Sequence, residues 1–213
     1  DESVAMARLA AEDGIAAIVA TPHVNEKLYD PGEISRRVSW LNHLLRKEKV
    51  PVSIMAGADV SVIFKPEQVS QYTINDTEYI LVEFPHTHLP RHAGEILEQF
   101  IDNGLNPIIT HPERNPTISG KPQALLELLG DQRYVQITAG SLTGDFGVDA
   151  KQCAEHLLRA GVVDVIATDA HSTEHRKPLL SLGAQAAAAI VGQDATRRMV
   201  FGTPMKIISG MDI

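Results

Sequence analysis

The sequence has little cysteine, no long apolar run and no cluster of basic residues, and each shortage excludes a class of protein. A single cysteine, Cys153, cannot form a disulfide within the chain, which fits a reducing compartment and predicts a cytoplasmic protein. The longest apolar run, residues 184–192, is rich in alanine and too short to span a bilayer. The net charge is -8 and Lys and Arg are scattered, so neither nucleic acid nor an anionic membrane is an expected partner.

The chain also lacks any linker or change in composition that would divide its 213 residues, so we predict one domain over residues 1–213. A hydrophobic fraction of 44% and a charged fraction of 22% are typical of a globular protein. Apolar residues recur at helical spacing from Val4 to Ala10, directly after a first residue that is not methionine. We therefore expect a segment upstream of this helix, and no signal peptide is recognisable.

Apolar runs alternate with amphipathic stretches along the whole chain, which predicts repeated βα units. Runs without polar alternation indicate strands buried on both faces, as in a parallel sheet covered by helices. No Gly-rich phosphate fingerprint follows the first strand, so a closed or nearly closed barrel is favoured over an open doubly wound sheet. The expected strands are residues 15–20, 52–58, 79–84, 107–110, 134–138, 163–168 and the final run "MKIIS" at 205–209.

Ionisable side chains stand at the ends of five of these apolar runs. In an α/β barrel the carboxyl ends of the strands converge on the face that carries the active site. Any one of these residues could instead cap a helix or hydrogen-bond within a loop, but six together predict a site. They are His23, Asp59, Glu83, His111, Asp169 and His171.

This set of three histidines, two aspartates and one glutamate predicts a centre for divalent metal ions such as Mn, Fe, Zn or Mg. Carboxylates can bridge two ions, an arrangement that generates hydroxide at neutral pH and suits phosphoryl displacement. Arg114 and Arg176 follow His111 and His171 closely, and guanidinium groups bind phosphate oxygens in a bidentate manner. Each arginine could also be an ordinary surface residue. Together with the metal ligands, they favour a phosphate hydrolase.

The segments "ATPH", "LVEFP", "THPERN", "QITAGSLTGDFG" and "ATDAHS" resemble those of the bacterial manganese-dependent protein tyrosine phosphatases of capsular and exopolysaccharide synthesis. These belong to the polymerase-and-histidinol-phosphatase (PHP) superfamily. The resemblance covers nearly the whole chain, in order. It implies a distorted (β/α)7 TIM-like barrel, two to three Mn²⁺ ions, and hydrolysis of phosphotyrosine on the tail of a tyrosine autokinase.

The same resemblance assigns roles to individual residues. It implies that the six ionisable residues at the strand ends are metal ligands, and that Arg114 and Arg176 bind the substrate phosphate during catalysis. Two departures stand out: the family's first strand, which ends in a His-x-His pair, would lie before Asp1, and position 59 carries Asp where the family usually carries Glu. The missing strand would expose the edge of residues 15–20, which favours self-association into a homo-oligomer.

Three alternatives stay open at the level of sequence. The same centre could hydrolyse a small alkyl phosphate such as histidinol phosphate, or the chain could be a catalytically impaired binding module. Cys153 and Arg159 have the C-x5-R spacing of cysteine-dependent tyrosine phosphatases, but they lie within an amphipathic helix rather than a phosphate-binding loop. The loop "HTH" at residues 86–88 is expected near the mouth of the site, with His88 as a substrate contact.

Overall fold

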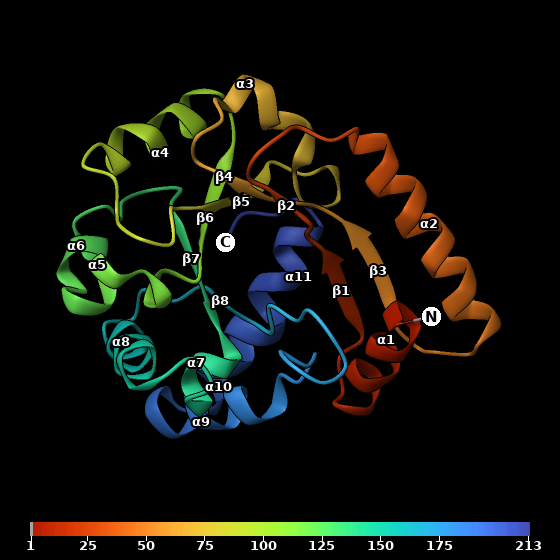
Figure 1. The fold of residues 1–213 in the computed structure, drawn as a ribbon. Helices are drawn as coiled ribbons and strands as arrows, with labels where there is room; N and C mark the ends of the chain where they lie inside the picture. Colours follow the sequence, from red (N-terminus) through yellow and green to blue (C-terminus); the bar gives the residue numbers. More distant parts are fainter. Residues whose placement is uncertain (1) are drawn as a thin grey trace.

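Parallel strands form the centre of the computed structural model, which describes residues 2–213, and helices surround them (Figure 1). The strands are β1 (Ala17–Ala20), β2 (His23–Val24), β3 (Ser53–Ala56), β4 (Asp59–Ser61), β5 (Tyr79–Glu83), β6 (Asn106–Thr110), β7 (Tyr134–Thr138) and β8 (Val165–Ala167). They pair in the orders β1-β3 and β2-β4-β5-β6-β7-β8, and every pair is parallel. The predicted α/β architecture is therefore confirmed.

Helices fill the connections between the strands. The α-helices are α1 (Glu2–Glu12), α2 (Pro31–Lys47), α3 (Pro66–Val69), α4 (Ala93–Asp102), α5 (Pro116–Gly120), α6 (Gln123–Leu126), α7 (Ala139–Thr143), α8 (Val148–Arg159), α9 (Ser181–Val191), α10 (Gln193–Arg197) and α11 (Thr203–Ile208). Short 3-10 turns form η1 (Ser70–Tyr72), η2 (Ile74–Asp76) and η3 (Pro112–Arg114), and η4 (Arg198–Gly202) is a π-helical turn. None of the helices within residues 2–213 is long and apolar enough to cross a membrane.

The two sheets continue into each other. Strand β1 runs on into β2 across Thr21 and Pro22, and pairing with the neighbouring chain segment persists there: Gly57 N donates to the carbonyl of Ala20 at 3.1 Å, and Asp59 N donates to that of Pro22 at 3.2 Å. Pro22 has no N–H to donate to a ladder, which explains the interruption.

The central strands owe their position to burial on both faces. Every residue of β5 and of β6 is buried, as expected for strands without polar alternation. The side chains of Ile80 and Ile109 pack in the main core with Leu97 and Phe100 of α4. This core fixes the carboxyl ends of β5 and β6, from which two of the predicted ligands extend.

One of the predicted strands needs correction. The run "MKIIS" forms helix α11 rather than a strand, because Pro204 occupies the first turn of this segment, where its missing N–H is tolerated in a helix. Within residues 2–213 no strand pairing joins β8 to β1, so the ring of strands is not closed by hydrogen bonds. A largely apolar cleft of about 640 Å³, lined by β1, β8 and α11, lies between them.

Candidate functional site

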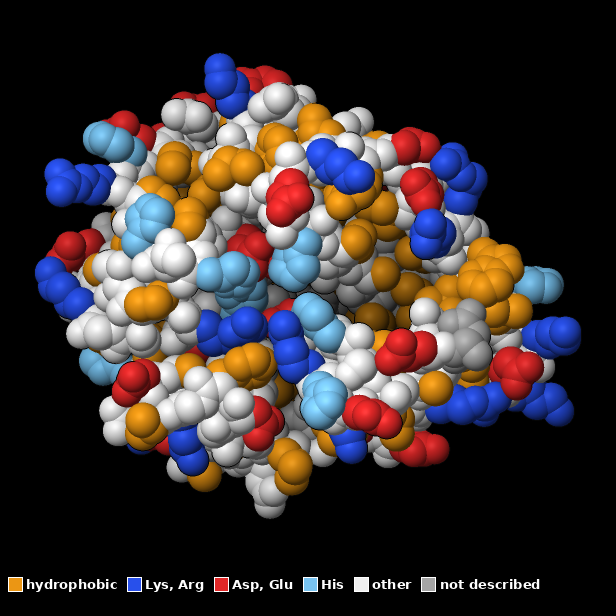
Figure 2. Space-filling view, viewed as in Figure 1, with side chains coloured by type: hydrophobic (Ala, Val, Ile, Leu, Met, Phe, Trp, Pro, Cys, Tyr) orange, Lys and Arg blue, Asp and Glu red, His pale blue; other side chains and the backbone are white. Residues whose placement is uncertain are grey.

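Four of the predicted ligands come from neighbouring strands. His23 begins β2 and stands in register with Asp59, the first residue of β4. Glu83 ends β5, and His111 directly follows β6. Because β2, β4, β5 and β6 are parallel and adjacent, and the short strands β2 and β4 follow directly after β1 and β3, the four side chains come to one place. Figure 2 shows pale blue histidines gathered with blue cationic side chains around a hollow at the centre of this face.

Glu83 lies at the middle of this group. Its Oε2 is 3.4 Å from His23 Nδ1, and its Oε1 is 3.1 Å from His111 Nε2. Asp59 Oδ2 lies 3.8 Å from each of the same two nitrogens. The hydroxyl of Thr110 donates to the Asp59 carboxylate at 3.2 Å, and this hydrogen bond helps to orient the carboxylate. The arrangement thus alternates acid and imidazole, as metal sites do.

The residues present fit a divalent metal ion. One donor atom from each of His23, Asp59 and Glu83 lies within 4.8 Å of the other two. The carboxylates of Asp59 and Glu83 are buried, and the buried atoms His23 Nδ1 and Glu83 Oε1 have charged neighbours but make no hydrogen bond of good geometry. Buried polar atoms normally have a bonding partner, so these two atoms favour a bound ligand such as a metal ion. Imidazole nitrogen and carboxylate oxygen are suitable donors for Mn, Fe or Zn.

The charges of the group also indicate a place for a cation. Burial would raise the pKa of Glu83, but the imidazoles of His111 and His23 outweigh it and lower that pKa. Burial lowers the pKa of His111, yet Asp59 and Glu83 raise it to about 9. Burial itself raises the pKa of Asp59. The carboxylates therefore favour a proton on His111, and a divalent ion that binds here would displace it.

The remaining predicted residues form a second group. Asp169 accepts from Arg114 Nη1 at 2.6 Å and also pairs with the guanidinium of Arg176. His171 connects the groups, because its Nδ1 is 3.9 Å from Asp169 Oδ1 and its ring centroid is 5.9 Å from that of His23. In this structure Asp169 thus bonds the arginines, and its predicted role as a metal ligand stays a prediction.

The backbone is unusual at three of these residues. His111, Asp169 and Arg176 have φ values of 35°, 49° and 52°, in the left-handed region that residues other than glycine rarely adopt. Such conformations cost about 1–3 kcal/mol each and cluster at functional sites. The surrounding structure therefore holds the backbone of these three residues in conformations that an unconstrained chain would rarely adopt.

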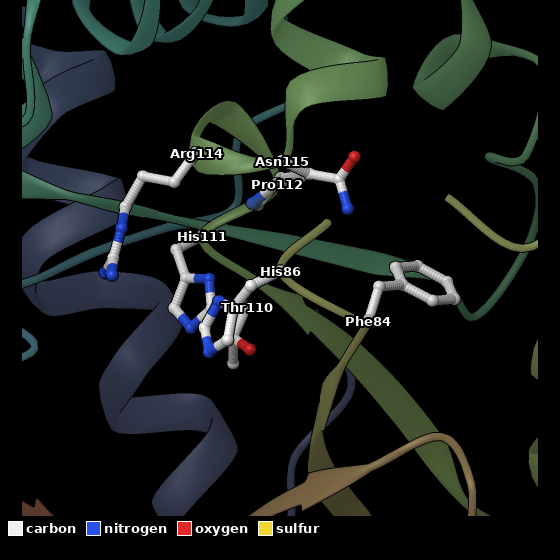
Figure 3. Close-up of a pocket in the computed structure, with 7 residues that line it drawn as sticks. All are labelled: Phe84, His86, Thr110, His111, Pro112, Arg114 and Asn115. Atoms are coloured by element: carbon white, nitrogen blue, oxygen red, sulfur yellow. The ribbon is translucent and has the colours of Figure 1, made fainter. Parts of the chain in front are cut away.

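The sequence placed His86 only near the mouth of the site, and it did not single out Glu113 at all. His86, not His88, reaches the cluster: its Nε2 is 3.4 Å from Glu83 Oε1, and its ring stacks on that of His111 with centroids 5.9 Å apart (Figure 3). His88 is exposed and pairs with the neighbouring Thr87 hydroxyl, so its predicted substrate contact stays a prediction. The position of His86 three residues beyond Glu83 was the available signal.

The unpredicted residue is Glu113, which is fully buried beneath the loop that carries Arg114. Its Oε1 accepts from the backbone N–H of Thr138 at 2.9 Å and from the hydroxyl of Ser141 at 2.7 Å. Glu113 therefore joins the loop after β6 to the start of α7. Nothing in its sequence context distinguishes it from a solvated surface glutamate.

Cys153 is excluded as a nucleophile. It is buried within α8, and its Sγ faces the carbonyl of Ile118 at 3.8 Å. Burial raises the pKa of its thiol to about 12, so the reactive thiolate is absent at neutral pH. The C-x5-R spacing with Arg159 is accordingly a coincidence of an amphipathic helix.

Comparison with known proteins identifies relatives over nearly the whole chain. The family described as "Capsular polysaccharide synthesis, CpsB/CapC" matches residues 1–209. The chain is 36% identical over 181 residues to tyrosine-protein phosphatase YwqE of Bacillus subtilis, covering 82% of this chain and 71% of the relative. It is 25% identical over 221 residues to tyrosine-protein phosphatase CpsB of Streptococcus pneumoniae, covering 98% and 90%.

A solved structure of the same family also matches this chain. It comes from work on YwqE of Bacillus subtilis and CpsB of Streptococcus pneumoniae, described as unique metal-dependent tyrosine phosphatases. Its TM-score to this chain is 0.92 at 31% sequence identity, and the match covers 100% of this chain and 88% of the solved one. The folds therefore agree over the full described length.

Proposed function

Since this chain belongs to the CpsB/CapC family of capsular polysaccharide synthesis, we propose that it is a metal-dependent phosphatase that hydrolyses phosphotyrosine in proteins. The observation that carries the proposal is the convergence of two guanidinium groups on one anionic oxygen, beside a buried cluster of imidazoles and carboxylates. Phosphate esters need both parts: cations that bind the anion and a centre that activates water.

The metal would be held by His23, Asp59, Glu83 and His111, with Asp169 and His171 completing the set. Bound divalent ions supply Lewis acidity and lower the pKa of water. Arg114 and Arg176 act on the substrate. Their guanidinium groups hold the nonbridging phosphate oxygens at the position where, in this structure, they bind the Asp169 carboxylate. The buried walls around Glu83 exclude bulk water, which strengthens these charge interactions.

An aryl phosphate matches the residues at this site. The phenolate of tyrosine has a conjugate acid with a pKa of about 10, so it leaves without a strong general acid. An alkoxide from an alkyl phosphate such as histidinol phosphate would need a proton from the protein. Relatives that carry the name tyrosine-protein phosphatase support the aryl substrate over the alkyl one.

The ion in this proposal is Mn²⁺, present as two to three ions, with Fe, Zn and Mg as alternatives that the same donors suit. The protein substrate in this proposal is the phosphotyrosine-bearing tail of a tyrosine autokinase in the cytoplasm, through which the enzyme controls capsular or exopolysaccharide synthesis. The family's link to capsular polysaccharide synthesis supports this assignment.

Turnover of two substrates tests the proposal. A phosphotyrosine peptide and histidinol phosphate are each incubated with the protein and Mn²⁺, and phosphate release is measured with and without EDTA. We expect chelator-sensitive release, with a larger kcat/KM for the peptide. A larger kcat/KM for histidinol phosphate would favour the small-molecule phosphatase, and metal binding without turnover of either substrate would favour a non-catalytic binding module.

A further inference from the structure

The loop between α7 and α8 places an aromatic ring against both arginines of the site. Phe146 is partly buried, and the guanidinium carbon of Arg114 lies 4.3 Å from the centroid of its ring. The corresponding distance for Arg176 is 5.6 Å. Both are within the range of about 6 Å over which the face of a phenyl ring attracts a cation. One ring therefore contacts both of the cations proposed to bind phosphate.

The backbone around this loop is built to hold the ring in place. Asp145 N donates to the Gly140 carbonyl at 2.9 Å, and the Asp145 carboxylate accepts from the Thr143 hydroxyl at 2.9 Å. Gly147 has a φ of 90°, a conformation that favours glycine. At Gly140 an added Cβ would lie 2.9 Å from Phe146 Cε2, so the ring packs directly on the backbone there. The packing and the hydrogen bonds of the loop therefore fix the position of the ring.

The two arginines need such support because their charges repel each other. Their guanidinium groups converge on a single carboxylate oxygen of Asp169, and both side chains are largely withdrawn from solvent, with exposures of 18% and 29%. Repulsion between like charges is stronger where water is excluded. Asp169 offsets it on one side, and the ring of Phe146 offers a second favourable contact that survives when a phosphate takes the carboxylate's place.

We propose that Phe146 is a positioning residue that holds Arg114 and Arg176 together in the orientation that receives a phosphate group. The inference rests on the proposed phosphatase function but concerns a residue that performs no chemistry. Phe146 acts through its contact with the two guanidinium groups. Without the face of its ring, the side chains of Arg114 and Arg176 separate when no anion lies between them. Binding of every phosphate-containing ligand should then weaken, including that of inorganic phosphate.

The test compares three variants with the wild type. Phe146→Leu removes the ring and keeps an apolar side chain, and Phe146→Tyr keeps the ring. Phe201→Leu is the matched control, because Arg197 lies 6.0 Å from that exposed ring, outside the site. For each, kcat and KM are measured on a phosphotyrosine peptide with Mn²⁺, and the inhibition constant of inorganic phosphate is measured alongside.

We expect Phe146→Leu to raise both KM and the phosphate inhibition constant by about tenfold, which corresponds to about 1.4 kcal/mol, within the range for partly desolvated cation–π pairs. Phe146→Tyr should restore both constants, and Phe201→Leu should change neither. A merely structural role would instead lower kcat through loss of active protein and leave KM and the inhibition constant unchanged. That outcome would overturn the proposal.

A spectroscopic readout separates this inference from the phosphatase function itself. In nitrogen–proton correlation spectra, the Nε–H signals of Arg114 and Arg176 should carry a ring-current shift that Phe146→Leu removes and Phe146→Tyr keeps. Titration with inorganic phosphate should move both signals less in Phe146→Leu. These shifts can be measured even if the wild type hydrolyses no phosphotyrosine, a result that would refute only the proposed function.

A second variant covers the case in which Phe146→Leu does not fold. Gly140→Ala keeps the ring and pushes it from its position, since the new methyl group would lie 2.9 Å from the ring edge. It should also raise KM and shift the two arginine signals. Unmoved arginine signals in a folded Gly140→Ala or Phe146→Leu protein would contradict the proposal.

Discussion

Replacing Glu113 by alanine should lower the free energy of unfolding by about 3 to 5 kcal/mol. The side chain is fully buried, and its Oε1 accepts two hydrogen bonds, from the Thr138 backbone N–H and from the Ser141 hydroxyl. Each buried donor left without a partner costs about 1–3 kcal/mol. The space vacated by the carboxyl group adds a cavity term.

The measurement is urea unfolding followed by circular dichroism, with two comparison variants. Glu113→Gln keeps the shape and an acceptor oxygen for both donors, so it should lose no more than about 1 kcal/mol. Glu95→Ala is the surface control, because Glu95 is exposed and pairs only with exposed His92, and it should change stability by less than about 0.5 kcal/mol.

A loss below about 1 kcal/mol in Glu113→Ala would contradict this prediction, since it would mean that the two donors find other partners. Equal losses in Glu113→Gln and Glu113→Ala would refute it in another way, because the hydrogen bonds would then not be the source of stability. The prediction matters for the site, since Glu113 directly precedes Arg114 and fixes its loop to α7.

Three further predictions concern other parts of the molecule. Glu83→Gln should weaken Mn²⁺ binding by at least about tenfold in calorimetry and abolish turnover, whereas Glu95→Gln should do neither; equal affinities would contradict the assigned centre. Cys153→Ser should retain phosphatase activity, and iodoacetamide at pH 8 should leave the folded wild type active, because burial raises the pKa of this thiol to about 12. Gly183→Ala should destabilise the protein by about 1–3 kcal/mol in urea unfolding, since its new Cβ would lie 2.8 Å from Ala139 Cα; unchanged stability would show that α9 can shift freely.

The sequence allowed the strands to be predicted where burial is two-sided. The runs that became β5, β6 and β8 contain no polar alternation, and the structure places them in the middle and at the end of one parallel sheet. The run at residues 205–209 was wrongly predicted as a strand because two adjacent isoleucines are typical of buried strands. Only Ile207 is buried there, and Pro204 lies in the first turn of a helix instead.

The candidate site was predictable to the extent that it follows strand ends. Each of His23, Asp59, Glu83 and His111 follows or ends an apolar run that forms a parallel strand, and these strands are adjacent, so a rule that requires only the positions of the runs along the chain brings the four together. Side chains that reach the site from loops follow no such rule.

The loop residues show why the rest was missed. The loop of His86 was expected near the mouth of the site, but the contact of His86 with Glu83 and the position of Phe146 against the arginines depend on how their loops fold back. The pairing of Asp169 with Arg114 likewise depends on a contact between residues about 55 positions apart.

Metal content and turnover measured on the same sample test whether the proposed metal centre carries out the hydrolysis. The protein is stripped with EDTA and dialysed, Mn²⁺ is added back in steps, and at each step bound manganese and phosphate release from a phosphotyrosine peptide are determined together. We expect turnover to be absent without metal and to rise in step with bound manganese. Turnover that persists in the stripped protein, or bound manganese without any turnover, would contradict it.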